Sequence, residues 1–190
     1  FYLDRPPVPL FTPKMPAESN CKTTEIHPGD LFDFNVEVEP MLNVLCLKTL
    51  EQARMAAEAG EVPVGALVVK DGQVIGEGYN QPISSCDPTG HAEIVAMRRA
   101  CEELQNYRLS GCDLYVTIEP CTMCVGAMIH ARIGKIIFGA AEPRAGALQS
   151  QLRLMDRDHY NHSIEWQGGV LAEECGEIIS SFFRRKRQQS

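Results

Sequence analysis

From residue 41 onward, apolar residues recur along this chain with two distinct periods. A helical spacing ends at Gly60, a favourable residue just past a helix C-terminus. Two valine-rich runs then flank Asp71 and Gly72, a pair typical of a tight hairpin turn. The patterns predict helices ending at 60, over 91–105, from 120 onward and over 170–188, with strands over 62–69, 73–79, 112–118, 135–139 and 163–166. Residues 146–158 are ambiguous and predict a short helix. Helices that alternate with strands after a hairpin indicate an α/β fold, a mixed sheet with helices on its faces.

The first 40 residues differ from the rest of the chain. They hold seven of the 12 prolines, with three basic and seven acidic residues. Proline disfavours long helices and central strands. We therefore interpret residues 1–40 as a proline-rich acidic extension to which we assign no chemistry. Residues 41–190 are predicted to form one domain.

The overall charge narrows the classes of partner. A formal net charge of -7 excludes a protein that holds nucleic acid by bulk charge alone. Residues 131–190 nevertheless hold nine basic and seven acidic residues, including a run at 184–187. This run is either a solvated helix end or a phosphate contact. No run of about 18 apolar residues predicts a membrane span, and no secretory or transit signal is visible. We expect a cytoplasmic protein.

Two short segments carry the candidate chemistry. The chain has eight cysteines, and its length and apolar content favour reduced thiols over a disulfide framework. Cys121 and Cys124 form a Cys-x-x-Cys pair after Pro120, at a predicted helix start, and His91 lies at another helix start. Imidazole and thiolates are preferred zinc ligands, and the positive end of a helix favours thiolates. Three protein ligands would leave a fourth position open for water, which is the pattern of a catalytic zinc.

Glu93 lies two residues after His91 and favours the catalytic interpretation. Residues two apart on a helix point about 200° away from each other, so both can serve one site only if the metal lies off the helix end. A carboxylate beside the ion could take a proton from its bound water. Zinc lowers the pKa of that water to about 7, so that hydroxide can attack an amidine carbon and expel ammonia.

Two less specific interpretations of the cysteine pair remain open at this point. Cys-x-x-Cys alone can be a redox pair. A closed structural zinc site would need a fourth ligand, which Cys86, Cys101 or Cys112 could supply.

Together, His-x-Glu and Pro-Cys-x-x-Cys resemble the signature of the zinc-dependent deaminases. The similarity extends over about residues 41–188 and is most specific to the bacterial tRNA-specific adenosine deaminases, within the cytidine deaminase-like superfamily. The segments that carry it are 61–66, 78–80, 87–94, 106–109, 114–124, 126–130 and 138–140.

The resemblance implies a three-layer α/β/α fold with a five-stranded mixed sheet, a homodimer, and conversion of the wobble adenosine of a tRNA anticodon loop to inosine. It implies one zinc ion bound by His91, Cys121 and Cys124, with Glu93 as the proton shuttle. By the same resemblance, Asn80 would hydrogen-bond the flipped nucleoside. Phe183 would pack near the anticodon loop, and the basic residues after it would touch phosphates.

Residues 141–153 depart from the family pattern, which places the detail of RNA recognition in question but not the chemistry. The alternative function is a small-molecule deaminase acting on guanine, cytosine or a deoxycytidine nucleotide. A non-catalytic RNA-binding subunit is a third possibility, and the presence of Glu93 disfavours it.

Overall fold

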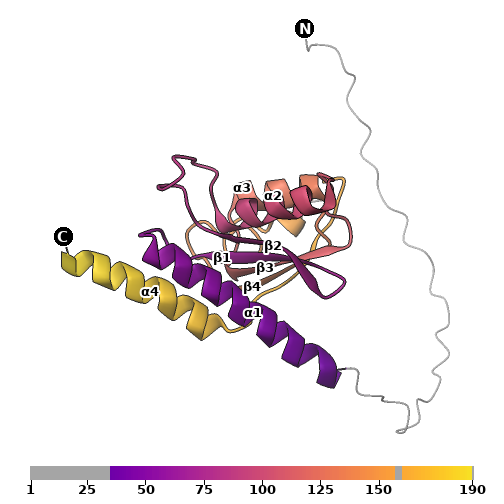
Figure 1. Cartoon of the computed structure of the whole chain (residues 1–190). Helices are drawn as coiled ribbons and strands as arrows, with labels where there is room; N and C mark the ends of the chain where they lie inside the picture. Colours follow the sequence, from indigo (N-terminus) through magenta and orange to yellow (C-terminus); the bar gives the residue numbers. More distant parts are fainter. Residues whose placement is uncertain (1–34, 157–159, 190) are drawn as a thin grey trace, which may run out of the picture. The chain divides into compact units, whose positions relative to one another are not determined.

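The computed structural model describes residues 35–156 and 160–189, and a five-stranded mixed sheet lies at the centre of this part (Figure 1). Across the sheet the strand order is β2-β1-β3-β4-β5. Strand β1 pairs antiparallel with β2 and β3, whereas β3, β4 and β5 are parallel. The strands are β1 (Gly65–Lys70), β2 (Gln73–Tyr79), β3 (Cys112–Ile118), β4 (Lys135–Ala140) and β5 (Glu165–Gln167). The predicted fold class, α/β with a five-stranded mixed sheet, is confirmed.

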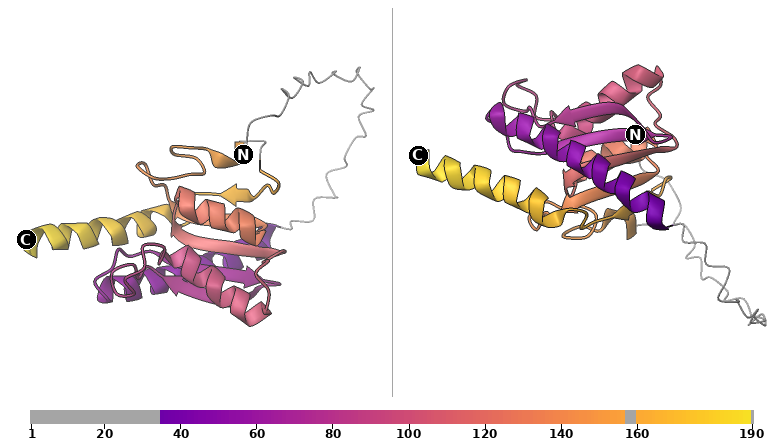
Figure 2. Two further views of the ribbon diagram at one scale, coloured as in Figure 1. Left: turned by 90° about the horizontal axis from the view of Figure 1, so that it is seen from above. Right: turned by 60° about the horizontal axis from the view of Figure 1, so that its bottom comes forward.

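Helices cover both faces of the sheet. Helices α2 (Ala92–Leu104) and α3 (Thr122–Ala131) lie side by side on one face (Figure 2). Helices α1 (Asn35–Glu58) and α4 (Ala172–Gln189) cover the other. Strand β1 is buried on both sides, so its alternate residues enter two different cores. Ala66 and Val68 pack toward α2 and α3, whereas Leu67 and Val69 pack toward α1.

Glycines in β2 let α2 approach the sheet closely. A Cβ atom at Gly76 would lie 2.3 Å from the carbonyl oxygen of Ala96, and one at Gly78 would lie 2.4 Å from that of Ala92. The backbone of α2 therefore occupies the space that side chains would fill. The start of this helix is fixed against the end of β2, close to His91.

The predicted hairpin is present between β1 and β2. Its two turn residues, Asp71 and Gly72, both have positive φ, of 50° and 76°. Two consecutive residues with positive φ are the requirement of a type I′ turn, which explains the aspartate-glycine pair.

Several boundaries differ from the predicted ones. Helix α1 begins at Asn35, six residues before the predicted start of the regular part. Pro120 was expected to be the first helical residue, but α3 begins at Thr122 with Cys121 as its N-cap, so this prediction is wrong. The ambiguous region contains one 3-10 turn, η1 (Leu154–Asp156), and residues 157–159 lie outside the described part. Of the extension, residues 1–34 also lie outside it.

Among the described residues, no helix has the length and apolar character that crossing a bilayer requires. Their seven cysteines are all free thiols, as expected; Cys21 lies outside the described part.

Candidate metal centre and active site

Three side chains from two helix starts meet at one point. His91 is the N-cap of α2, Cys121 is the N-cap of α3, and Cys124 lies in the first turn of α3. The Nδ1 atom of His91 lies 3.7 Å from the Sγ atom of Cys121 and 3.6 Å from that of Cys124. The two sulfurs are 3.7 Å apart. The structure thus brings together the three residues predicted to bind zinc.

The chain leading into α2 is held by Asn80, one of the predicted site residues. Asn80 follows β2 and is buried. Its backbone N–H donates to the carbonyl of Val64, and its side-chain Oδ1 accepts the N–H of Ala92 at 2.9 Å. This bond satisfies one of the free N–H groups at the start of α2. Asn80 therefore ties the end of β2 to the helix start that carries His91.

Proton sharing dominates the electrostatics of the two sulfurs. The hydrogen bond between the two sulfurs lowers the pKa of Cys121 to about 4, with a further contribution from His91. The same contact with Cys121 raises the pKa of Cys124. The contact between the two sulfurs thus shifts their pKa values in opposite directions. A metal cation bound here would displace the shared proton and interact with both sulfurs.

The spacing of the three atoms fits a zinc ion. Bonds of about 2.3 Å to sulfur and about 2.05 Å to nitrogen at tetrahedral angles place two sulfurs about 3.8 Å apart, and sulfur and nitrogen about 3.6 Å apart. The distances of 3.7, 3.7 and 3.6 Å between the ligand atoms match these values. Among the described residues, the group that could hold a metal ion contains His91, Cys121 and Cys124 alone.

The cysteines considered as a fourth ligand lie elsewhere. Cys86 is exposed, with its Sγ directed to the carbonyl of Ile83. The thiol of Cys101 is directed to the carbonyl of Tyr107, and Cys112 is buried at the start of β3. The donor set is therefore that of a three-ligand site, which is typical of catalytic zinc.

Glu93 is buried beside the ligands, in the first turn of α2. Its side chain is only 3% exposed. Burial raises the pKa of its carboxyl group, and the charge of Cys121 raises it further. The charge of His91 and a hydrogen bond with Cys124 act in the opposite direction and lower it. A raised pKa makes the carboxyl group a better proton acceptor, and such a group close to a metal site is a candidate general acid and base.

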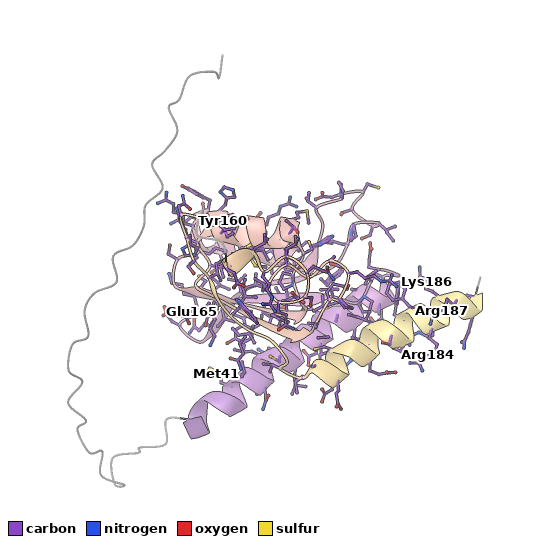
Figure 3. The ribbon with its side chains drawn as sticks, turned by 180° about the vertical axis from the view of Figure 1, so that it is seen from behind. Met41, Tyr160, Glu165, Arg184, Lys186 and Arg187 are labelled. Atoms are coloured by element: carbon purple, nitrogen blue, oxygen red, sulfur yellow. The ribbon has the colours of Figure 1, made fainter. Side chains whose placement is uncertain are left out.

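Phe183, the other predicted substrate residue, lies well away in sequence, on α4. It is 43% exposed and packs edge to face on Phe182. Phe183 lines a cavity of about 570 Å³ together with Arg144 and Arg187. Figure 3 labels Arg187 near the C-terminal end of α4, with Arg184 and Lys186 beside it. An aromatic ring can stack a base, and guanidinium groups lining the same cavity can contact phosphates.

Sequence reasoning missed Glu119, the residue before Pro120. Its carboxylate is buried and accepts hydrogen bonds from residues 142–150. An acidic residue between an apolar strand and a helix start was a weak signal, since its partners lie far along the chain. Arg144 was also missed as a cavity residue, because only the fold brings it next to α4.

Comparison with known proteins agrees with this geometry. The sequence matches the MafB19-like deaminase family over residues 44–187. It is 48% identical over 141 residues to the tRNA-specific adenosine deaminase of Haemophilus influenzae, covering 74% of this chain and 82% of that protein. The enzyme of the same name from Bacillus subtilis is 39% identical over 142 residues, covering 75% of this chain and 88% of that protein.

A solved structure is similar as well. It comes from studies of A-to-I editing by tRNA:A34 deaminases at the wobble position of transfer RNA, and it is 42% identical with a TM-score of 0.70. The similarity covers 71% of this chain and 98% of that one. A separate match to radial spoke protein 3 covers residues 1–61, which include none of the site residues.

Proposed function

This chain belongs to the MafB19-like deaminase family and to the tRNA-specific adenosine deaminases, and we propose that it converts the wobble adenosine of a tRNA anticodon loop to inosine. The observation that carries this proposal is the meeting of one imidazole and two sulfurs within 3.7 Å of one another, with a buried carboxyl group beside them.

In this proposal His91, Cys121 and Cys124 hold one zinc ion. Zinc would supply a Lewis acid that makes water a nucleophile near neutral pH. The fold brings the three residues together: two are N-caps of helices packed on the same face of the sheet, and the third lies one turn further along.

Glu93 carries the protons of the reaction. It accepts a proton from the attacking water and delivers it to N1 of adenine as the new C–O bond forms at C6. It then takes the remaining proton from the hydroxyl group added at C6 and passes it to the exocyclic amine. The C6–N bond breaks, and ammonia leaves. The product is a C6 carbonyl, and Glu93 returns to its starting state, so the reaction balances as hydrolysis.

The RNA would be held outside the reacting centre by Asn80 and Phe183. The NH₂ group of Asn80 would donate to the nucleoside, while its Oδ1 accepts the N–H of Ala92. Phe183 would stack a neighbouring base of the loop, and Arg144 and Arg187, which line the same cavity, would contact its phosphates. Bases in a single-stranded loop are already unstacked, so little energy is needed to turn one into the site.

The proposal includes a homodimer located in the cytoplasm. An apolar groove of about 450 Å³ between α2 and α3, lined by Met97, Tyr107 and Ala127 among others, supports a contact with a second copy. Tyr107 is 68% exposed there. The cytoplasmic location follows from a tRNA substrate and remains a proposal.

A deamination assay tests the function. The zinc-loaded protein is incubated with an anticodon stem-loop bearing adenosine at the wobble position, and inosine is measured by digestion and mass spectrometry. Glu93→Gln should retain one zinc per chain and lose turnover, because the amide cannot carry the proton. Absence of inosine with the wild-type protein would contradict the proposal.

The alternative, a deaminase of free bases or nucleotides, is tested in the same experiment. Ammonia release from guanine, cytosine and deoxycytidine monophosphate is compared with release from the stem-loop. Faster turnover of any small substrate than of the RNA would favour the alternative. A stem-loop with guanosine at the wobble position is the matched control for the substrate base.

A further inference from the structure

Glu119 is a buried carboxylate two residues before the zinc ligand Cys121. It follows β3 and is 2% exposed. Its backbone N–H donates to the carbonyl of Ala140 at the end of β4, which fixes the residue between the two parallel strands. Nothing in the proposed reaction uses this carboxylate, and its burial therefore needs another explanation.

Both carboxylate oxygens of Glu119 accept hydrogen bonds from one loop, residues 141–151. Oε1 accepts the consecutive backbone N–H groups of residues 148, 149 and 150, at 3.0, 2.8 and 3.0 Å. Oε2 accepts the N–H of Glu142 at 3.1 Å and the hydroxyl of Ser150. These five bonds join the two ends of the loop through a single side chain. Such charge-assisted bonds are stronger than bonds between neutral groups.

The loop is also attached directly to the residues that follow Glu119. Ala147 donates its N–H to the carbonyl of Pro120 at 3.0 Å, and Gly146 forms a β-bridge with Cys121. A Cβ atom at Gly146 would lie 2.4 Å from the carboxyl carbon of Glu119. The loop backbone thus lies directly against the carboxylate and the start of α3.

The middle of this loop forms a wall of two cavities. Arg144 lines the cavity that contains Phe183 and also a smaller one of about 370 Å³. The smaller cavity is bordered by Cys121, Thr122 and Gln151 as well. The loop therefore connects the metal ligands with the surface on which the RNA would lie.

We infer that Glu119 is a positioning residue: it holds the loop of residues 141–151 so that Arg144 contacts the nucleotides beside the reacting base. The inference rests on the proposed function. Glu119 is neither a ligand nor a proton carrier, since both its oxygens are occupied by the loop and it does not belong to the group of metal-binding atoms. Contacts to neighbouring nucleotides are made equally in the ground state and the transition state, so their loss raises KM and leaves kcat nearly unchanged.

Two substitutions test this inference at different strengths. Glu119→Gln keeps the shape but places an NH₂ group against backbone N–H donors, which must then separate. Ser150→Ala removes one hydroxyl bond and keeps the backbone bond of the same residue. We expect KM for the stem-loop to rise about tenfold or more in the first variant and about threefold in the second, with kcat within about threefold of wild type and one zinc per chain.

Hydrogen exchange separates positioning from general loss of stability. In both variants the amides of residues 142, 148, 149 and 150 should exchange faster than in the wild type. Leu45→Ala is the matched control, because Leu45 is buried on α1 at the opposite face of the sheet. It should lower the melting temperature without changing KM or the exchange of the loop.

The outcomes are distinct. Unchanged KM and unchanged loop exchange in Ser150→Ala and Glu119→Gln would overturn the inference, as would a fall in kcat with loss of zinc. If Glu119→Gln does not fold, KM and loop hydrogen exchange in Ser150→Ala alone decide whether the inference holds. If the wild-type protein makes no inosine, the proposed function fails, and the exchange rates still establish whether Glu119 holds the loop.

Discussion

Gly78 in β2 determines where the first turn of α2 lies, and its replacement should therefore disturb the chemistry. A Cβ atom there would lie 2.4 Å from the carbonyl oxygen of Ala92 and 2.6 Å from the nitrogen of Ala96. Ordinary contacts of this kind are about 3.5 Å or longer, so α2 must move away from the sheet by about 1 Å. His91 and Glu93 flank Ala92 and move with it.

The size of the effect follows from this displacement. A misplacement of about 1 Å in a catalytic group lowers the rate by about 100-fold, equivalent to about 2.7 kcal/mol in activation free energy. Overpacking also lowers the free energy of unfolding, by about 1–3 kcal/mol. Gly78→Ala should therefore lose both activity and stability.

Gly76→Ala is the control that separates these two losses. Its Cβ atom would meet Ala96 at 2.3 Å and Ala100 at 2.8 Å, a similar clash one turn further from His91. Both variants should melt at lower temperature, but kcat/KM on the stem-loop should fall at least about tenfold further in Gly78→Ala, because the clash lies next to the site. Gly134→Ala, at an exposed position with ordinary contacts, should resemble the wild type in both measurements. Equal kcat/KM in Gly76→Ala and Gly78→Ala would refute the reasoning.

Three further outcomes are expected. Chelation should stop turnover and expose one additional reactive thiol in a thiol titration, that of Cys121, because Cys124 is buried and its pKa is raised. Added zinc should reverse both effects. Asn80→Ala removes the acceptor of the Ala92 N–H and should lower the free energy of unfolding by about 0.5–2 kcal/mol, measured by denaturant titration. Burial raises the pKa of Cys46 to about 12 and that of Cys175 to about 11, above the value of about 8.5 in the unfolded chain. The stability that the two neutral thiols contribute is therefore complete below about pH 8.5 and is lost as the pH rises toward those values. Unfolding of Cys46→Ala in an alkaline titration should therefore begin at a higher pH than unfolding of the wild type.

The sequence predicted the elements whose signals are local. The hairpin followed from Asp71 and Gly72, because two consecutive positive φ angles require such residues. The meeting of His91, Cys121 and Cys124 was predictable because each lies at a helix start marked in the sequence. The predicted start of α3 at Pro120 is two residues too early. Proline suits the first helical position, but here Cys121 is the N-cap and Pro120 precedes it.

Interactions between distant segments could not be predicted in this way. Glu119 accepts bonds from residues 23 to 31 positions later in the chain, and no periodic pattern marks the loop that donates them. The close approach of α2 to β2 explains Gly76 and Gly78, yet the sequence alone shows only two glycines in a strand. The cavity beside Phe183 depends on Arg144, which reaches α4 only through the folded loop.

The proposed ligand set joins two parts of the fold that lie apart along the chain. His91 follows the β1–β2 hairpin, whereas Cys121 and Cys124 follow β3. An ion bound by all three closes a loop of 30 residues between His91 and Cys121. Its binding adds to the free energy of unfolding in proportion to the logarithm of its free concentration. Cells starved of this metal should therefore contain less of the protein, through faster degradation of the ion-free form, as well as a smaller active fraction.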